Sequence, residues 1–281
     1  MSDNRPFTVG HIPYLNCVPF FHYLSKYGFS GKLISGVPSA LNRMLQQAEL
    51  DVSPSSSFEY ARNWRNYLLL PGHSISSAGP VESVLLFSPL PLSDLAGETI
   101  AITGDSATSI NLLRILLREF VGLDQVVDEV PDQPVEALIE KGKPALLIGD
   151  RALQMACNRP HSMHRFDLGQ LWYQYTGLPF VFALWMARRD SVKTYGEELS
   201  ALCGQLDQSR SRFLAEVDSL AEILCPESCL TDQGKAAYWR TIDYGLDEKH
   251  LAGLELFFDL CLKYQLLDEP AQLEFLPPGE N

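Results

Sequence analysis

The stretch Asp105-Ser106-Ala107-Thr108-Ser109 follows a short apolar run, Thr99-Ile100-Ala101-Ile102, and precedes a segment in which apolar residues recur at helical spacing up to Phe120. The run contains β-branched residues and is bounded by glycines, so it predicts a buried strand, and the spacing predicts a helix over 108–120. A strand that turns into a helix through small hydroxyl residues leaves free backbone N–H groups at the positive end of the helix dipole. The stretch therefore predicts an anion site without Lys or Arg, with ordinary N-capping as the alternative. Its candidate ligand-binding residues are Ser106, Thr108 and Ser109.

A second stretch with the same arrangement, Leu50-Asp51-Val52-Ser53-Pro54-Ser55-Ser56-Ser57, again leads from a short strand through hydroxyl residues to a helix start. Ser56 is its candidate ligand-binding residue, although three consecutive serines also fit a plain loop. The first apolar run of the chain, Phe7–Ile12, ends in a loop with prolines on both sides, and Asn16 lies in that loop. Ligands of open α/β sheets bind beyond the C-terminal ends of the strands. Asn16 is therefore a candidate site residue, with a turn asparagine as the alternative.

Two α/β lobes are expected from the order of the strand and helix signals. Prolines are dense in Pro89-Leu90-Pro91-Leu92, which favours an extended crossover, and the long apolar run Gly177–Met186 is suited to a second one. The expected lobes are residues 1–88 with 186–281, and residues 89–185. The polar segment His73–Pro80 contains glycine and is expected to be a loop, and the chain from about Asp190 onward is expected to be helical.

The composition excludes some classes of protein. Of the 281 residues, 22 are Lys or Arg and 35 are Asp or Glu, so the net charge is 22 − 35 = −13, which is unsuited to general nucleic-acid binding. No apolar segment of a signal peptide follows residues 1–6, and no apolar stretch approaches the ~18 residues of a membrane span, so we expect a cytoplasmic protein. Its six cysteines are then expected to be reduced thiols. Cys225 and Cys229 have no second pair to complete a zinc spacing, so no metal site is expected.

Several blocks of the sequence follow one another in a specific order. They are Ile12-Pro13-Tyr14-Leu15-Asn16-Cys17, Pro38-Ser39, Leu50-Asp51-Val52, Gly79-Pro80-Val81-Glu82-Ser83-Val84, Leu147-Ile148-Gly149-Asp150, and Asp167-Leu168-Gly169 with Trp172 and Thr176-Gly177-Leu178-Pro179-Phe180-Val181-Phe182-Ala183. Together these blocks, within residues 7 to 190, closely resemble the chorismate dehydratase family of the futalosine route to menaquinone. The chain departs from the usual pattern at Ser55, where the family more often has an apolar residue, and at Ala78.

This resemblance implies an α/β fold of the two-lobed type II periplasmic-binding-protein-like kind, with a ligand cleft between the lobes. The family converts chorismate to 3-[(1-carboxyvinyl)oxy]benzoate and water without a metal or organic cofactor. Asn16 and Ser83 match positions implicated in catalysis, and the substrate's own side-chain carboxylate can serve as the base. The substrate-binding candidates are then Ser56, Ser106, Thr108, Ser109, Gly149 and Asp150. Capping of the following helix is the alternative role of Asp150.

Two other functions stay open at this point. A non-enzymatic protein that binds a small anion could have the same fold, because fold alone does not settle function. The 1,4-dihydroxy-6-naphthoate synthase of the same pathway also shares the fold. The expected partner is the small-molecule substrate chorismate, with no nucleic acid and no membrane, and the sequence predicts no oligomeric state.

Overall fold

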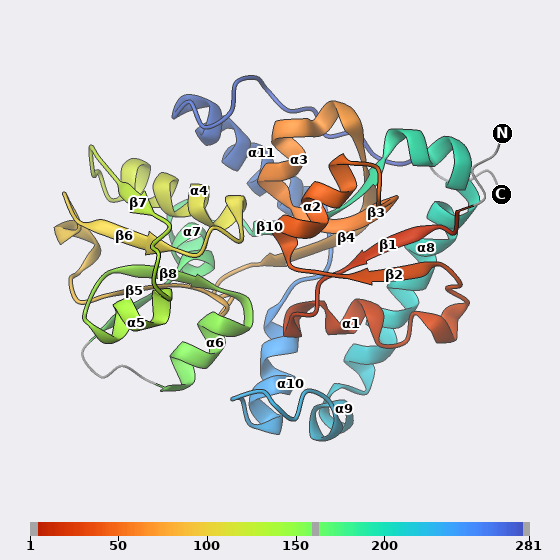
Figure 1. The fold of residues 1–281 in the computed structure, drawn as a ribbon, viewed down its shortest axis with the longest axis horizontal. Helices are drawn as coiled ribbons and strands as arrows, with labels where there is room; N and C mark the ends of the chain where they lie inside the picture. The colour runs from red at the N-terminus through yellow and green to blue at the C-terminus, as the bar shows by residue number, and fades with distance from the viewer. Residues whose placement is uncertain (1–4, 159–162, 278–281) are drawn as a thin grey trace.

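The computed structural model describes residues 5–158 and 163–277. Its strands form two five-stranded sheets, each flanked by helices, and the two resulting lobes lie side by side in Figure 1. The expected two-lobed α/β architecture is confirmed.

Lobe one, at the right of Figure 1, is built on the first sheet and its helices. Their bounds are β1 Thr8–His11, α1 Val18–Phe21, β2 Lys32–Ser35, α2 Pro38–Gln46, β3 Val52–Ser56, α3 Ser57–Asn63, β4 Tyr67–Ser77 and β10 Phe180–Arg188. The strand order is β2-β1-β3-β10-β4. β1 is parallel to β2 and β3, whereas β10 is antiparallel to β3 and β4. The crossovers between parallel strands carry α1 and α2, because parallel strands cannot be joined by a tight hairpin.

Lobe two, at the left of Figure 1, contains the second sheet. Its elements are β5 Val84–Ser88, β6 Thr99–Ile102, α4 Ala107–Ile115, β7 Val127–Glu129, α5 Val135–Glu140, β8 Ala145–Ile148, α6 Gly149–Asn158, β9 His164–Asp167 and α7 Leu168–Thr176. The strand order is β7-β6-β8-β5-β9, with β6 parallel to β7 and β8 and with β5 antiparallel to β8 and β9. The expected helix over 108–120 begins one residue earlier and ends in a π-helical segment, Leu116–Phe120.

Four helices follow β10, and the last of them contacts both β10 in lobe one and α4 in lobe two. The four helices are α8 Arg189–Ala215, α9 Val217–Ile223, α10 Asp232–Thr241 and α11 Glu248–Lys263. The expectation of helix to the end of the chain is wrong after Lys263, because the described residues 264–277 contain no helix. The side chain of Asp247 caps α11 by accepting hydrogen bonds from the backbone N–H groups of Lys249 (2.9 Å) and His250 (3.1 Å). A Cβ on Gly253 would lie 2.1 Å from the carbonyl oxygen of Pro179, so only glycine lets α11 pack this closely against the segment before β10.

The chain passes from one lobe to the other at positions that differ from those expected from the sequence. β5 belongs to the second sheet and β10 to the first, so the chain changes lobe before Val84 and before Phe180, rather than after residues 88 and 185. Both strands are almost wholly buried apolar runs, and such runs do not reveal in which sheet they pair. The expectation of a loop over His73–Pro80 is wrong for its first five residues, because β4 continues to Ser77. Ser74, Ser76 and Ser77 are buried, and their backbones pair with β10 in the sheet. A polar side chain does not by itself reveal such a buried strand position.

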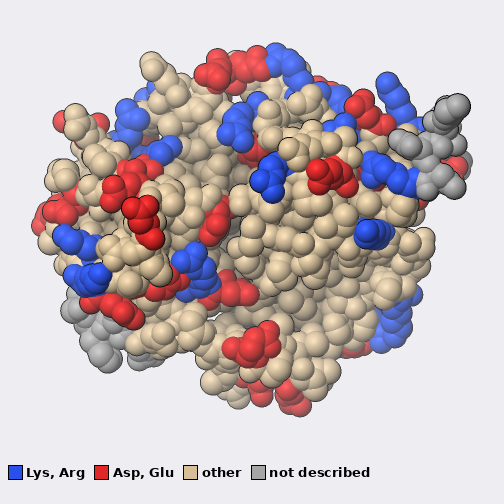
Figure 2. Space-filling view, in the orientation of Figure 1, with Lys and Arg blue, Asp and Glu red and all other residues tan. Residues whose placement is uncertain are grey.

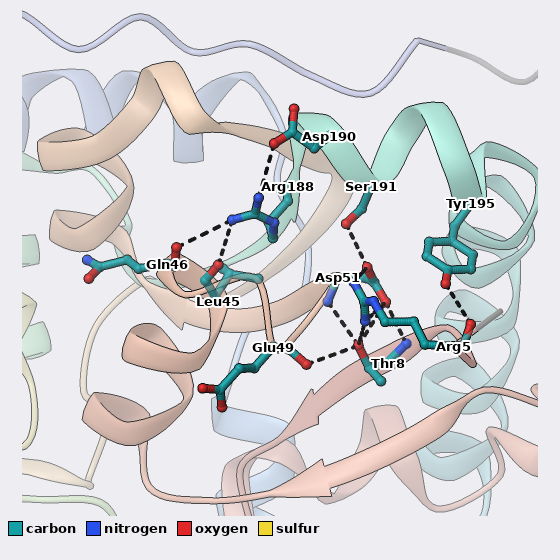
Figure 3. A network of polar contacts seen from close by, with 10 residues as sticks. All are labelled: Arg5, Thr8, Leu45, Gln46, Glu49, Asp51, Arg188, Asp190, Ser191 and Tyr195. Carbon is teal, nitrogen blue, oxygen red and sulfur yellow. Dashed lines mark hydrogen bonds and ion pairs between the residues drawn. The ribbon is translucent and has the colours of Figure 1, made fainter. Parts of the chain in front are cut away.

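A buried carboxylate joins α8 to the first sheet (Figure 3). Asp51, directly before β3, is 0% exposed, and its two oxygens accept hydrogen bonds from Arg5 (2.6 and 3.0 Å) and from the hydroxyl of Ser191 in α8 (2.6 Å). The N–H and the hydroxyl of Thr8 at the start of β1 also donate to it, each at 2.8 Å. Because every partner is a donor, the buried charge is compensated and fixes the position of α8.

A disulfide bond joins the two lobes, which corrects the expectation of six reduced thiols. It links Cys157 near the end of α6 with Cys229 before α10, and the two Cα atoms are 6.3 Å apart. The pair is separated by 72 residues in sequence, so no local spacing reveals it. The other cysteines are free thiols: Cys17, Cys203, Cys225 and Cys261.

The surface carries charges of both signs. Figure 2 shows Lys and Arg interspersed with Asp and Glu over the face it displays, without a continuous basic patch. None of the helices in the described ranges combines the length and the apolar character needed to cross a membrane. Within the same ranges, no three His, Cys, Asp or Glu side chains gather as ligands for a metal ion.

Candidate active site

A cavity lies between the lobes, where the C-terminal ends of parallel strands from both sheets meet. In open α/β sheets such an edge is the usual place for a ligand. The residues that line it are Ile12, Tyr14, Asn16, Cys17, Pro38, Ser55, Ser56, Ile75, Val81, Ser83, Val84, Ser106, Ser109, Ile148, Gly149, Phe182 and Ala183. The wall is therefore mostly apolar with a few hydroxyl and amide groups, as is common for small-molecule sites.

All but two of the site residues predicted from the sequence line this cavity. The six that line it are Asn16, Ser56, Ser83, Ser106, Ser109 and Gly149. The first two come from lobe one and the last four from lobe two or the segment leading into it, so the structure brings together residues that are far apart in sequence. Their chemical roles stay predictions.

Thr108 and Asp150 do not line the cavity, because both side chains bind the opposite lobe. The hydroxyl oxygen of Thr108 accepts a hydrogen bond from the backbone N–H of Phe58 at 2.9 Å and lies 3.3 Å from the hydroxyl of Ser57. A carboxylate oxygen of Asp150 accepts one from the backbone N–H of Leu15 at 3.1 Å. Neither side chain caps its own helix, and both instead hold the lobes together beside the cavity.

The two hydroxyl-rich turns act as helix caps and also line the cavity. Ser56 accepts a hydrogen bond from the N–H of Glu59 at the start of α3, and Ser106 accepts one from Ser109 at the start of α4, both at 3.3 Å. Capping and ligand binding are alternatives on the sequence alone, and the geometry permits both. Within the described residues, the N–H groups of Ala107 and Thr108 donate to no protein acceptor, so the first turn of α4 can bind an anion.

The loop that carries Asn16 is fixed from two sides. The carbonyl oxygen of Leu15 accepts a 2.7 Å hydrogen bond from the indole N–H of Trp239 in α10, while its N–H is bound to Asp150. The side-chain oxygen of Asn16 is buried and has no hydrogen-bond partner among the described residues. A buried acceptor without a partner is unfavourable, so this amide is placed to receive a hydrogen bond from a ligand.

The segment before Ser83 is held by a carboxylate that the sequence reading did not assign a role. Asp167 accepts hydrogen bonds from the N–H groups of Val81 (3.0 Å) and Glu82 (2.6 Å), and Glu82 has a φ of 61°. The carbonyl of Ser83 accepts a 2.7 Å bond from the N–H of Gly149. Ser83 is 1% exposed, and its hydroxyl donates to the carbonyl of Val81 at 3.3 Å, so it is positioned rather than activated by a base.

The titratable groups of the wall are both neutral at ordinary pH. Burial raises the pKa of the Tyr14 phenol to about 12, with the nearby carboxylates of Asp105 and Asp150 adding to the effect. Burial also raises the pKa of the Cys17 thiol well above its usual range. The lining residues include no Lys, Arg, His, Asp or Glu. The nearby Arg151 is paired with Glu136 at 2.7 Å. The wall itself therefore offers neutral donors, with no charged side chain and no strong base.

Two polar lining residues, Tyr14 and Ser55, were not among the site residues predicted from the sequence. Tyr14 packs on Gly149, where an added Cβ would lie 3.1 Å from the ring, so the missing side chain of Gly149 lets the lobes approach. Tyr14 lies in the loop that carries Asn16, and Ser55 lies in the hydroxyl-rich stretch before α3. Their place in these two stretches is the sequence signal that could have identified them as site residues. Which side chains of a stretch face the cavity depends on packing.

Comparison with known protein sequences identifies the family to which the chain belongs. The family model described as "Menaquinone biosynthesis" matches residues 7–263. A chorismate dehydratase of Thermus thermophilus is 33% identical over 267 residues, which cover 90% of this chain and 94% of the relative. One from Campylobacter jejuni is 31% identical over 180 residues, 62% of this chain and 64% of that protein.

Solved structures give the fold. The periplasmic aliphatic sulphonate binding protein SsuA of Escherichia coli superimposes with a TM-score of 0.69 at 14% identity, covering 98% of this chain and 97% of that one. This likeness establishes the periplasmic-binding-protein-like fold, and the family match covers most of the sequence. The chain belongs to the menaquinone biosynthesis family.

Proposed function

We propose that this protein is a chorismate dehydratase, which converts chorismate to 3-[(1-carboxyvinyl)oxy]benzoate and water. The family match and the relative at 33% identity over 90% of the chain support this assignment. The observation that carries the proposal on the structural side is the cavity wall, which offers neutral hydrogen-bonding groups and no protein base or cation.

Chorismate is a dianion, so its carboxylates need donors. The hydroxyls of Ser106 and Ser109 at the start of α4 line the cavity and supply such donors without a formal charge, and the positive end of the helix dipole favours an anion there. The neutral phenol of Tyr14 is a further donor at the wall. Apolar side chains such as Phe182 face the rest of the ligand and exclude water.

The reaction removes the proton from the carbon that bears the enolpyruvyl ether and the hydroxyl from the neighbouring ring carbon. The substrate's own side-chain carboxylate takes that proton, which fits a wall whose titratable groups, Tyr14 and Cys17, are both held in their protonated form. Asn16 bonds to the departing hydroxyl, and Ser83 helps to hold the reacting conformation. The proton and the hydroxyl leave as one water, and the ring becomes aromatic.

The test is conversion of chorismate by the purified protein after treatment with a chelator and dialysis. Liquid chromatography with mass detection should show an aromatic product lighter than chorismate by one water, far above a control without protein. The Asn16→Ala, Ser83→Ala double variant is the matched control for contaminating activity. Chorismate that binds but persists would indicate a non-enzymatic binder. Consumption of cyclic dehypoxanthine futalosine instead would indicate the 1,4-dihydroxy-6-naphthoate synthase.

The proposal includes independence from cofactors, which the chelation step tests, and a cytoplasmic location. In that compartment disulfides are rare. Alkylation of thiols in denaturant immediately on cell lysis tests the redox state that this location implies: six alkylated thiols per chain indicate a fully reduced protein, and four indicate that the Cys157–Cys229 bond persists in the cell.

A further inference from the structure

Four serines stand at the end of β3 and the start of α3, and three of them bind protein atoms. The hydroxyl of Ser53 donates to the carbonyl of Pro54 at 2.9 Å, and that of Ser57 donates to the carbonyl of Val181 at 2.8 Å. The hydroxyl of Ser56 caps α3. These three side chains therefore have local structural uses.

Ser55 differs from the other three. It is 0% exposed, and its hydroxyl oxygen has no hydrogen-bond partner among the described residues. It also lines the cavity between the lobes, whereas Ser53 and Ser57 do not. A buried hydroxyl that gains nothing from the protein is unfavourable, so its presence at the wall indicates a partner that arrives with the ligand.

The cavity thus holds two buried polar atoms without protein partners, the side-chain oxygen of Asn16 and the hydroxyl of Ser55. The amide oxygen can only accept, so it requires a donor such as a ligand hydroxyl. Chorismate has a single hydroxyl and several anionic oxygens. Once its hydroxyl is bound to Asn16, the group left for Ser55 is an oxygen that accepts.

We propose that Ser55 is a substrate-binding residue whose hydroxyl donates a hydrogen bond to a carboxylate oxygen of the bound anion. The identity of that anion rests on the proposed function, whereas the role of Ser55 rests on its burial and its unpartnered hydroxyl. Hydrogen bonds to a charged group are stronger than neutral ones. Loss of this bond should weaken ligand binding about 10- to 100-fold.

The experiment compares Ser55→Ala with Ser53→Ala. Both residues are fully buried serines of β3, and only the first faces the cavity. The measurements are the KM for chorismate and the rise in melting temperature produced by isophthalate, an aromatic dicarboxylate that needs no turnover. The melting temperature of each free variant is recorded to separate binding from folding.

For Ser55→Ala we expect a KM raised about tenfold or more, a much smaller isophthalate shift, and a free protein no less stable than the wild type, because only an unpaired hydroxyl is lost. Ser53→Ala should lose some stability, with its KM and isophthalate shift within about twofold of the wild type.

Wild-type KM and isophthalate shift in Ser55→Ala would overturn the inference while leaving the proposed function intact. A free Ser55→Ala protein destabilised as much as Ser53→Ala would also overturn it, because the hydroxyl would then have a structural use. If the wild type leaves chorismate unchanged but isophthalate distinguishes the two variants as expected, the proposed function fails and the role of Ser55 stands.

Discussion

Breaking the disulfide between the lobes should lower the stability of this protein substantially. The Cys157–Cys229 bond closes a segment with a sequence separation of 72 and joins α6 of lobe two to the segment before α10 on lobe one. In the chain-entropy view, a cross-link of that span restricts the unfolded chain by about 4 kcal/mol. For a chain of 281 residues this corresponds to a fall in melting temperature on the order of 10 °C.

The assay is thermal unfolding of the wild type and Cys229→Ser, each with and without a thiol reductant. The reductant should lower the melting temperature of the wild type to that of the variant and leave the variant unchanged. Cys225→Ser is the matched control, because Cys225 is a free, partly buried thiol in the same segment and should retain both the wild-type stability and the response to reductant.

A wild type whose melting temperature ignores the reductant and equals that of Cys229→Ser would refute this reasoning. A fall of the same size in Cys225→Ser would also refute it, because the effect would then come from packing near the segment. Mass measurement of the alkylated, non-reduced protein establishes beforehand that the bond is present in the sample.

Three further outcomes are expected. Asn16→Ala should lower the turnover of chorismate about 10²-fold while changing the affinity for isophthalate little, because a neutral amide contributes mainly to the transition state; single-turnover kinetics and calorimetry separate the two. Thr108→Val should cost about 1–3 kcal/mol in urea unfolding, because the buried N–H of Phe58 loses its acceptor, and Thr108→Ser should retain the wild-type stability. Burial lowers the pKa of His73 from 6.5 to about 4, so between these values the unfolded chain binds a proton that the folded chain excludes. Stability should therefore fall as pH is lowered from 7 to 5, by about 2 kcal/mol more in the wild type than in His73→Gln, and equal slopes in urea unfolding would contradict this.

The sequence alone determined the features that depend on neighbouring residues. The apolar run Thr99–Ile102 is β6 with the bounds expected, and the hydroxyl-rich turn after it caps α4. Asp247 caps α11 in the same way. Strand periodicity and helix capping act over a few residues, so the sequence contains their causes locally. The same turns mark the strand ends where ligands bind in such folds, which is why most of the predicted site residues line the cavity.

The tertiary structure decided which of those polar groups are available to a ligand. Thr108 and Ser55 stand in equivalent hydroxyl-rich turns, yet Thr108 binds the N–H of Phe58, 50 residues away, whereas Ser55 finds no protein partner and faces the cavity. The pairing of Cys157 with Cys229 and the assignment of β5 and β10 to their sheets likewise join segments distant in sequence. A hydrogen bond, a disulfide or a strand pair forms only when packing brings both partners within a few ångströms, and the local pattern around either partner does not contain that distance.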